Sequence, residues 1–228
     1  MQIRWLLLVW GATFIVACTH LPTAPEIKAT DTVRTLTTGM SISMHTKERG
    51  ISARGYLIYR HPDFLRLLFT SPFGATIAEL TGTDDNLSII IPGKHVVYSG
   101  NIRNLNPQSP LRNWRRFIWV IKPLTESPNR TGAVDFQTPD SITEAVMYDS
   151  NGFVTRKTTA SGDVVQYKAY HLYNGVAVPD TIEFDNGHGD TIKLTFEDPE
   201  VNQPLDGNAE MPDTIGYESL PLEEFKGL

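Results

Sequence analysis

The stretch FLRLLFTSPFGATIAEL, residues 64–80, decides the fold of this chain. Apolar side chains occupy both parities of 64–70, which indicates a strand packed on both of its faces. Pro72 and Gly74 favour a tight turn, and residues 75–81 form the next expected strand. Because the turn is tight, Phe73 at its centre is expected to point outward. The alternative is that Phe73 folds back onto the core.

The rest of the chain repeats this pattern of short strands and tight turns. Residues 40–44 alternate between apolar and polar side chains, as in a half-buried strand. Asn-Gly pairs follow at 151–152, 174–175 and 186–187, and such pairs favour the type I′ turns of hairpins. Further strands are expected at 51–60, 87–91, 95–99, 134–137, 142–148, 153–159, 164–173, 176–184 and 191–197. The pattern predicts a meandering antiparallel sheet that curls towards a barrel.

Helical spacing is found in the middle of the chain. Residues 110–121 place Pro110 at the first helical position and Trp114 and Ile118 on one apolar face, with the arginines largely elsewhere. Two interpretations remain open: a lid packed on the sheet, or a helix on a membrane surface whose arginines meet lipid phosphates. A second, short helix is expected at 31–36.

The only cysteine, Cys18, indicates where the protein is located. Arg4 precedes an apolar run that ends at Ala17, directly before Cys18. A basic start, an apolar core and a small residue before the cut are typical of a secretory signal. The run is shorter than the roughly 20 residues that a membrane span needs. The site resembles a bacterial lipobox, which implies removal of residues 1–17 and acylation of Cys18, palmitate included. The alternative is an uncleaved signal anchor that contains a cysteine.

The segments around the expected domain are polar. Residues 18–29 contain Pro22 and Pro25 and no apolar period, as in a lipidated tether. The residue after Cys18 is Thr19 rather than Asp, which by resemblance to other lipoproteins points to the outer membrane. We therefore expect a lipid anchor at the periplasmic face of the cell outer membrane. One folded domain is expected at 30–198, followed by a C-terminal tail at 199–228.

Composition and motifs argue against several classes of function. A net charge of −6 and a pI of about 5.5 disfavour a nucleic-acid partner, which requires a basic face. With its one cysteine acylated, the chain has no thiol for a disulfide, a metal or a nucleophile. The six histidines show no metal-binding spacing, and no G-x-S-x-G motif occurs. We expect no enzyme, no catalytic residue, no metal and no cofactor. Catalysis is the weaker alternative.

The 64–80 stretch is similar to the string RLLLTNPLG, followed by a strand, in LolB, an outer-membrane lipoprotein receptor. Gly55 before a strand and PLRNW at 110–114 fit the same pattern. On these motifs the chain is identified as a member of the LolA/LolB-like carrier and receptor superfamily, closest to LolB, over roughly residues 30–198. The resemblance implies a mainly β (α+β) fold. This fold is an unclosed antiparallel β-barrel of about 11 strands, with helices covering the concave apolar face.

The resemblance also implies an apolar cavity that receives acyl chains. Candidate cavity or lid residues, any of which could equally be ordinary core, are Leu57, Leu65, Leu67, Phe69, Trp114 and Ile118. Phe73 matches the hydrophobic residue that aids membrane insertion in the family, which makes Pro72, Phe73 and Gly74 a candidate membrane-contact loop.

The resemblance implies a function and partners. The expected function is an outer-membrane lipoprotein that binds the acyl chains of lipoproteins and delivers them to the outer membrane. Expected partners are acylated lipoproteins or other lipids, a periplasmic LolA-like carrier and the outer-membrane bilayer. The alternative is an envelope lipoprotein of the same fold that binds another lipid or amphiphile in transport or assembly.

Overall fold

The structure is a computed structural model that describes residues 31–47, 50–121, 131–137, 143–205, 212 and 214–227. The predicted signal peptide, Cys18 and the tether lie outside the described residues.

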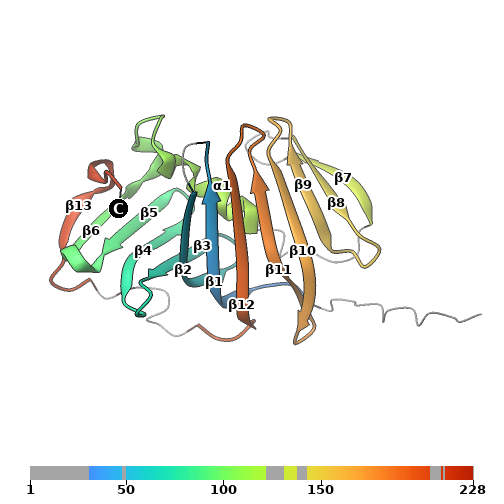
Figure 1. The fold of residues 1–228 in the computed structure, drawn as a ribbon, viewed down its shortest axis with the longest axis horizontal. Helices are drawn as coiled ribbons and strands as arrows, with labels where there is room; N and C mark the ends of the chain where they lie inside the picture. The colour runs from blue at the N-terminus through green and yellow to red at the C-terminus, as the bar shows by residue number, and fades with distance from the viewer. Residues whose placement is uncertain are drawn as a thin grey trace, which may run out of the picture.

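The described residues form a single sheet of thirteen strands (Figure 1). In spatial order its strands are β13-β6-β5-β4-β3-β2-β1-β12-β11-β10-β9-β8-β7, and every neighbouring pair is antiparallel except β13 with β6. The strand bounds are β1 (Thr35–His45), β2 (Gly50–Arg60), β3 (Phe64–Thr70), β4 (Thr76–Thr83), β5 (Asn86–Ile91), β6 (Val96–Asn101), β7 (Gly132–Gln137), β8 (Thr143–Tyr148), β9 (Val154–Thr159), β10 (Val164–Tyr173), β11 (Val176–Asp185), β12 (Thr191–Val201) and β13 (Glu218–Pro221). β13 and β7 are the two ends of this order, so the sheet is unclosed, as the resemblance to LolA/LolB-like domains implied.

One α-helix, α1 (Trp114–Ile121), lies among the described residues, after a 3-10 turn over Pro110–Asn113. Its side chains and carbonyls contact groups as far apart as Glu144 on β8 and Gly82 on β4. In a flat sheet these strands are eight spacings apart, roughly 38 Å, whereas an eight-residue helix is about 12 Å long. One short helix can reach both strands only because the sheet curls around it.

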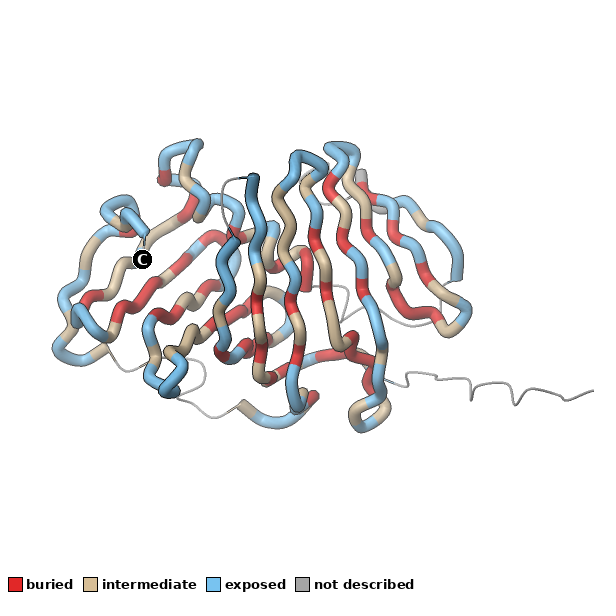
Figure 2. The backbone as a smooth tube through the Cα atoms, viewed as in Figure 1, coloured by how far each residue is buried: buried red, intermediate tan, exposed pale blue. Residues whose placement is uncertain are grey.

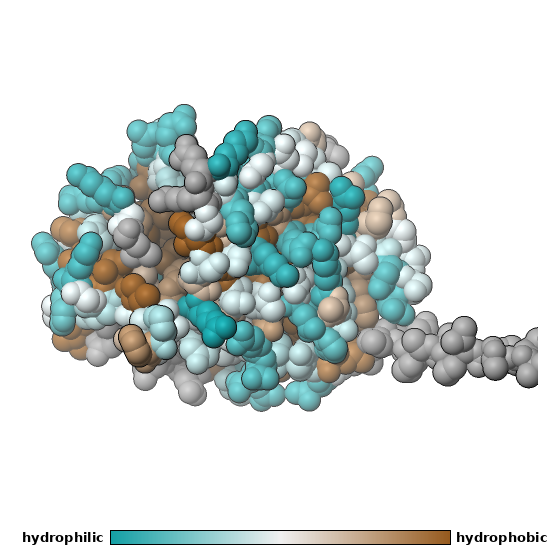
Figure 3. Space-filling view, in the orientation of Figure 1, coloured by the Kyte–Doolittle hydropathy of each residue, from teal (hydrophilic) through white to brown (hydrophobic). Residues whose placement is uncertain are grey.

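The two faces of the sheet differ. In β1, Leu36, Met40 and Ile42 alternate with more exposed residues and join the core cluster. Figure 2 shows buried and less buried residues alternating along the strands. In β3 both faces are buried, as the sequence predicted: Leu65 belongs to the inner cluster, whereas Arg66 lies on the opposite face and pairs with Glu79 at 2.8 Å. Figure 3 shows mostly hydrophilic and intermediate side chains in the same view, with apolar ones gathered in a hollow on its left.

The prediction of a short helix at residues 31–36 is wrong. Thr35 and Leu36 begin β1, where they pair with Arg60 and Tyr59 of β2. β-branched threonines and valine dominate this segment and favour a strand. Pairing with β2 and burial of Leu36 outweigh the local capping signal on which the helix prediction depended.

The C-terminal segment differs from the expected tail in its described part. Residues 199–201 complete β12, and β13 adds a parallel strand to β6. Beyond β13, Leu222 is 1% exposed, and the ring of Phe225 packs edge-on against Tyr98 at 5.3 Å between ring centroids. This segment extends the folded domain, and the sheet has thirteen described strands rather than about eleven.

Gly55→Ala is expected to destabilise the sheet, because the backbones of β2 and β3 approach closely at Gly55. A Cβ at this position would lie 1.6 Å from the carbonyl oxygen of Leu68, so β3 would have to shift. Overpacking of this kind costs about 1–3 kcal/mol, which urea unfolding at equilibrium measures. The control is Gly93→Ala, whose Cβ has nothing within 4 Å and should change stability by less than about 0.5 kcal/mol. Equal unfolding midpoints for the two variants would contradict the close approach.

Asp63→Asn is expected to raise Tm at pH 7. The side-chain hydrogen bond with Asp84, followed by burial, raises the pKa of Asp63 above its ordinary value. A carboxyl whose folded pKa is raised contributes stability at low pH and loses it as the pH rises through that pKa. At neutral pH the two carboxylates repel each other, and asparagine removes that repulsion. Thermal melts from pH 4 to pH 8 should show that the gain in Tm from Asp63→Asn becomes smaller as the pH falls. A gain in Tm that stays the same across this pH range would contradict the interaction between Asp63 and Asp84.

Candidate functional site

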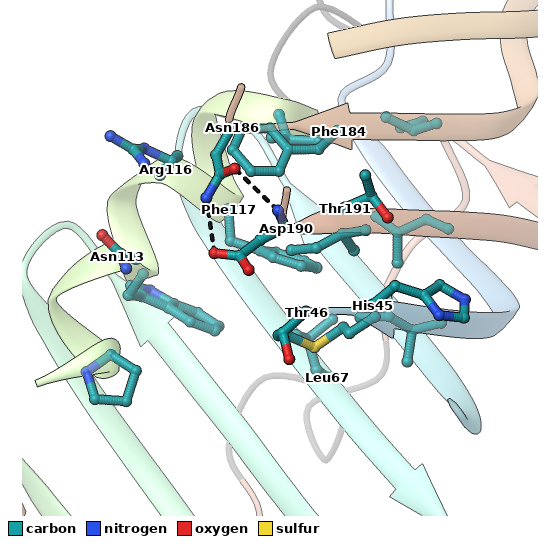
Figure 4. Close-up of a pocket in the computed structure, with 18 of the residues that line it drawn as sticks. His45, Thr46, Leu67, Asn113, Arg116, Phe117, Phe184, Asn186, Asp190 and Thr191 are labelled. Carbon is teal, nitrogen blue, oxygen red and sulfur yellow. Dashed lines mark hydrogen bonds between the residues drawn. The ribbon is translucent and has the colours of Figure 1, made fainter. Parts of the chain in front are cut away.

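A cavity of about 530 Å³ lies between the inner face of the sheet and the α1 segment (Figure 4). Its walls come from strands that are distant in sequence, β1, β3, β4, β11 and β12. The apolar lining residues are Ile42, Met44, Leu67, Phe69, Leu80, Leu111, Trp114, Phe117, Val120, Ile182, Phe184, Ile192 and Leu194. Strand alternation explains the set, because residues two apart in one strand project from the same face. The cavity is therefore a gap in the core cluster itself, and α1 forms its roof.

The mouth of the cavity is polar. Its residues are His45, Thr46, Asn113, Arg116, Asn186 and Asp190, from the end of β1, the start of the α1 segment and the β11–β12 turn. Figure 4 shows the β11–β12 turn residues between α1 on one side and His45 and Thr46 on the other. All six are exposed or half-buried, whereas Leu67, Ile182 and Leu194 of the floor are buried. Polarity thus increases from the floor to the mouth.

The β11–β12 turn is fixed by its own side chains. The amide oxygen of Asn186 accepts from the backbone N–H of His188 at 2.8 Å and of Asp190 at 3.1 Å. The Asn186 amide nitrogen donates to Asp190 Oδ2 at 2.8 Å. These bonds hold both polar groups in a defined place at the mouth.

The first turn of α1 is held on the β4 side of the cavity. The Trp114 indole lies so close to Gly82 that a Cβ there would be 2.3 Å from Nε1, so glycine is required. The Asp85 carboxylate, in the turn after β4, forms ion pairs with Arg115 of α1 and with Arg103. Both contacts fix the first turn of α1 to the part of the sheet that contains β4 and β5.

The last turn of α1 is held by the part of the sheet that contains β8, β9 and β10. Lys157, 1% exposed, lies 4.7 Å from the centroid of the Trp119 ring and 3.5 Å from Glu144 Oε2, and its ammonium donates to the Trp119 carbonyl at 3.4 Å. The Trp119 indole donates to the same Glu144 carboxylate. The Tyr167 hydroxyl donates to the Val120 carbonyl at 2.6 Å. The carbonyls of Trp119 and Val120, at the end of the helix, thereby gain hydrogen-bond donors from the sheet. α1 is therefore fixed to both parts of the sheet.

Three of the six predicted lining residues border the cavity. Leu67, Phe69 and Trp114 line it directly. Leu57, Leu65 and Ile118 belong instead to the surrounding core cluster and do not line the cavity. The apolar face of α1 packs on the sheet rather than facing a membrane, because Trp114 and Ile118 are both buried.

Sequence reasoning missed the contribution of β11 and β12. Ile182, Phe184, Ile192 and Leu194 form most of one wall. Their spacing of two residues in expected neighbouring strands was the available signal. The polar mouth gave no such signal, because Asn186 reads as an ordinary turn residue.

The β3–β4 loop projects from the sheet. Gly74 N–H donates to the Ser71 carbonyl at 2.9 Å, which closes a four-residue turn around Pro72 and Phe73. Phe73 is 98% exposed, so the alternative in which it folds back onto the core does not hold. Tyr56 on β2 and Ile77 on β4 are also large apolar residues that remain exposed.

The described residues contain no group of three or more His, Cys, Asp or Glu side chains placed to hold a metal ion. Within the same residues, no helix has both the length and the apolar content needed to cross a membrane.

Comparison with solved structures gives the fold. One similar structure is a putative outer membrane lipoprotein-sorting protein domain from Vibrio parahaemolyticus, with a TM-score of 0.52 and 13% identity over 78% of this chain and 89% of that one. Another is a DUF1329 family protein from Desulfovibrio piger, with a TM-score of 0.54 and 8% identity over 79% and 90%. A LolA superfamily protein from Nitrosomonas europaea matches at a TM-score of 0.48 with 12% identity over 80% and 92%.

Comparisons of the sequence itself find no matching family model and no matching curated protein. At these levels of identity the structural similarities concern the fold. The chain shares its fold with the lipoprotein-sorting protein domain from Vibrio parahaemolyticus and with the DUF1329 family protein from Desulfovibrio piger.

Proposed function

We propose that this chain is a lipid-binding carrier of the bacterial envelope, and more specifically an outer-membrane lipoprotein that receives the acyl chains of lipoproteins and delivers them to the outer membrane. The observation that carries the proposal is the apolar cavity of about 530 Å³ under α1, with its polar mouth. The presence of the same fold in a lipoprotein-sorting domain supports it.

The energetics of such a cavity suit a carrier. Each methylene group removed from water contributes about 0.8 kcal/mol, so a long acyl chain is held firmly in an apolar lining. A carrier must also release its cargo, and a cavity with a polar mouth leaves the chain an exit. The proposal involves no covalent step, so the protein acts as a carrier and not as an enzyme.

Attachment and delivery belong to separate parts of the chain in this proposal. Acyl groups on Cys18 anchor the protein at the periplasmic face of the outer membrane, and residues 18–29 tether the domain. Phe73, exposed on the β3–β4 loop, contacts the bilayer into which the cargo is released. A periplasmic LolA-like carrier is the proposed donor of the cargo.

A second candidate function is the binding of a different lipid or amphiphile in envelope transport or assembly. The cavity volume favours it, because about 300–1,000 Å³ is the usual size for a single small ligand. Both candidates use the same cavity and the same anchor.

Depletion of the protein in its bacterial host distinguishes the two candidates. Under the receptor proposal, lipoproteins accumulate in the inner membrane or the periplasm when the protein is depleted, as fractionation and immunoblotting would show. Normal lipoprotein sorting would eliminate the receptor role. A lipid that co-purifies with the protein would then support the second candidate.

Phe73→Glu is expected to reduce delivery to membranes about tenfold or more while leaving the fold intact. Burial of one phenylalanine is worth about 1.5–3 kcal/mol, and 1.4 kcal/mol corresponds to a factor of ten. The measurement is transfer of a labelled acylated cargo to liposomes. The control is Leu172→Glu, an exposed apolar residue near the β10–β11 turn, at the opposite end of the sheet from the β3–β4 loop. Delivery by Phe73→Glu at the rate of the control would exclude the loop from membrane contact.

A further inference from the structure

Exposed apolar side chains gather at one end of the sheet. Eight large apolar residues among the described ones are exposed, and four of them lie where β1 and β3 end and where β2 and β4 begin: Met44, Ile51, Phe73 and Ile77. These strands are consecutive antiparallel neighbours, so the four ends belong to the same end of the sheet. Apolar side chains that gather in this way, rather than scatter singly, mark an interaction site. We call these four residues the apolar rim.

Strand pairing connects the members of the apolar rim. Met44 and Ile51 are direct partners across β1 and β2. β3 ends three register positions short of Ile51, and the loop that carries Phe73 continues in the same direction. Ile77, the second residue of β4, lies at the irregularity in the pairing of β4 with β3. The apolar rim therefore follows neighbouring strands in order from β1 to β4.

The apolar rim borders the mouth of the cavity. Met44 lines the cavity, and so does Ile192, its partner on β12. Thr46, one of the mouth residues, lies two residues after Met44. A surface that contacts the apolar rim would therefore face the opening of the cavity.

The composition of this end of the sheet suits a lipid surface. The chain as a whole is acidic, with 26 Asp and Glu residues against 20 Lys and Arg residues. The described residues around the apolar rim, 40–47, 50–54 and 70–78, include Lys47 and Arg54 but no Asp or Glu. Apolar side chains accompanied by cations are typical of a contact with the interface of an anionic membrane.

Lys47 has a defined place beside the mouth. A Cβ on Gly189, in the β11–β12 turn, would lie 3.1 Å from Cε of Lys47, so the stem of the lysine packs on this turn. Asp185 and Asp190 flank the same turn, which restricts an anionic surface to the β1–β4 side of the mouth. A lysine stem can cover apolar surface while its ammonium group reaches phosphates.

The point at which the chain enters the domain supports the same occupant. Asp31 pairs with Val176 at the start of β11, at the end of the sheet opposite the apolar rim. In Figure 1 the first described residues run below the sheet, whereas β1 points upward. Asp31 lies thirteen residues after Cys18, and a chain of this length can span at most about 45 Å. β1 has 11 residues and is about 35 Å long. The chain is therefore long enough for acyl groups on Cys18 and the apolar rim to contact one bilayer.

We propose that the apolar rim is a bilayer-docking surface, and that the domain stands on it with the mouth of the cavity against the membrane. The inference rests on the function proposed above, in which Phe73 supplies one contact. It adds the β1–β2 end of the sheet as a second contact and Lys47 as the group that favours anionic lipids. It also gives the direction in which the mouth faces.

Vesicle flotation of the chain from residue 19 onwards tests the proposal. This chain retains every described residue and lacks both the apolar run of residues 1–17 and Cys18. Ile51→Glu should lower partitioning into phosphatidylcholine–phosphatidylglycerol vesicles about tenfold or more. The matched control is Met147→Glu on β8, because both side chains are 49% exposed and neither lines the cavity. Ile77→Glu, also 49% exposed, repeats the test from β4.

A second pair of variants tests the role of Lys47. Lys47→Glu should lower the preference for vesicles with phosphatidylglycerol over pure phosphatidylcholine about fivefold or more. Lys226→Glu makes the same change of charge beyond β13, away from the apolar rim, and should keep the preference. Loss of the preference to the same extent in both variants would mean that net charge, rather than Lys47, selects the lipid.

The outcomes separate this inference from the proposed function. Equal vesicle binding by Ile51→Glu, Ile77→Glu and Met147→Glu would overturn the docking surface and leave both cargo binding and the Phe73 contact standing. Normal flotation of Ile51→Glu together with lost cargo transfer from a periplasmic carrier would mean that the apolar rim receives a protein, which also overturns the proposal. Absence of vesicle binding by the unsubstituted chain would overturn the docking surface and the Phe73 contact together.

Discussion

Phe69→Glu is expected to empty the cavity, with a loss of at least a hundredfold in affinity for acyl ligands. Phe69 lines the cavity from β3 and is only partly buried, so the substituted side chain has room to be accommodated. A carboxylate in an apolar lining either remains charged without a partner or takes up a proton, and both cost free energy when a chain enters. A penalty of about 2.7 kcal/mol gives the hundredfold loss. Titration with a fluorescent fatty acid measures it.

Two further variants show whether charge in the cavity is the cause. Phe69→Leu keeps the lining apolar and should retain binding within a few-fold. Met147→Glu places the same charge at an exposed position on β8 that does not line the cavity. Equal affinities for Phe69→Glu and Met147→Glu would mean that acyl chains bind somewhere other than under α1.

Cys18→Ala is expected to abolish lipid attachment, the other large effect. A single acyl chain gives only marginal membrane binding and stable anchoring needs two or more signals, so loss of every acyl group should shift the protein to the soluble fraction. Labelled palmitate incorporation and carbonate extraction of membranes measure the change. Persistent palmitate labelling would mean that Cys18 is not the acylated residue.

Thr19→Asp is the matched variant at the neighbouring position. By resemblance to lipoproteins with this signal, Asp after the acylated cysteine marks retention in the inner membrane. The variant should therefore remain lipidated but fractionate with the inner membrane. Recovery of Thr19→Asp in the outer membrane would remove the basis for the proposed location without affecting the anchor.

The strands were predictable because their signals are local. Residues 64–80 contain two apolar runs and a Pro-x-Gly turn, and these became β3, the β3–β4 turn and β4. Apolar residues on both parities of β3 correctly indicated burial on both faces. Alternation separates the two sides of a strand but does not say which side faces the cavity. That choice depends on the curl of the whole sheet around α1.

Contacts distant in sequence were not predictable in the same way. β13 pairs Glu218 with Val96 in a parallel register, across more than a hundred residues, and no local pattern announces such a pair. Asn186 and Asp190 read as turn residues, and their place at the mouth depends on β12 packing beside β1. The helix expected at 31–36 failed for the same reason, since pairing of β1 with β2 overrode a local signal.

The most direct test of the account is the mass of whatever the Cys18→Ala protein retains after expression in its bacterial host, measured natively and again after denaturation. Without acyl groups on Cys18, any difference between the two masses is a ligand that is not covalently bound. The account predicts about one acyl-bearing molecule per protein, and its loss in the Cys18→Ala/Phe69→Glu double variant. A Cys18→Ala protein without any acyl-bearing ligand, or the same ligand at the same occupancy in both proteins, would contradict it.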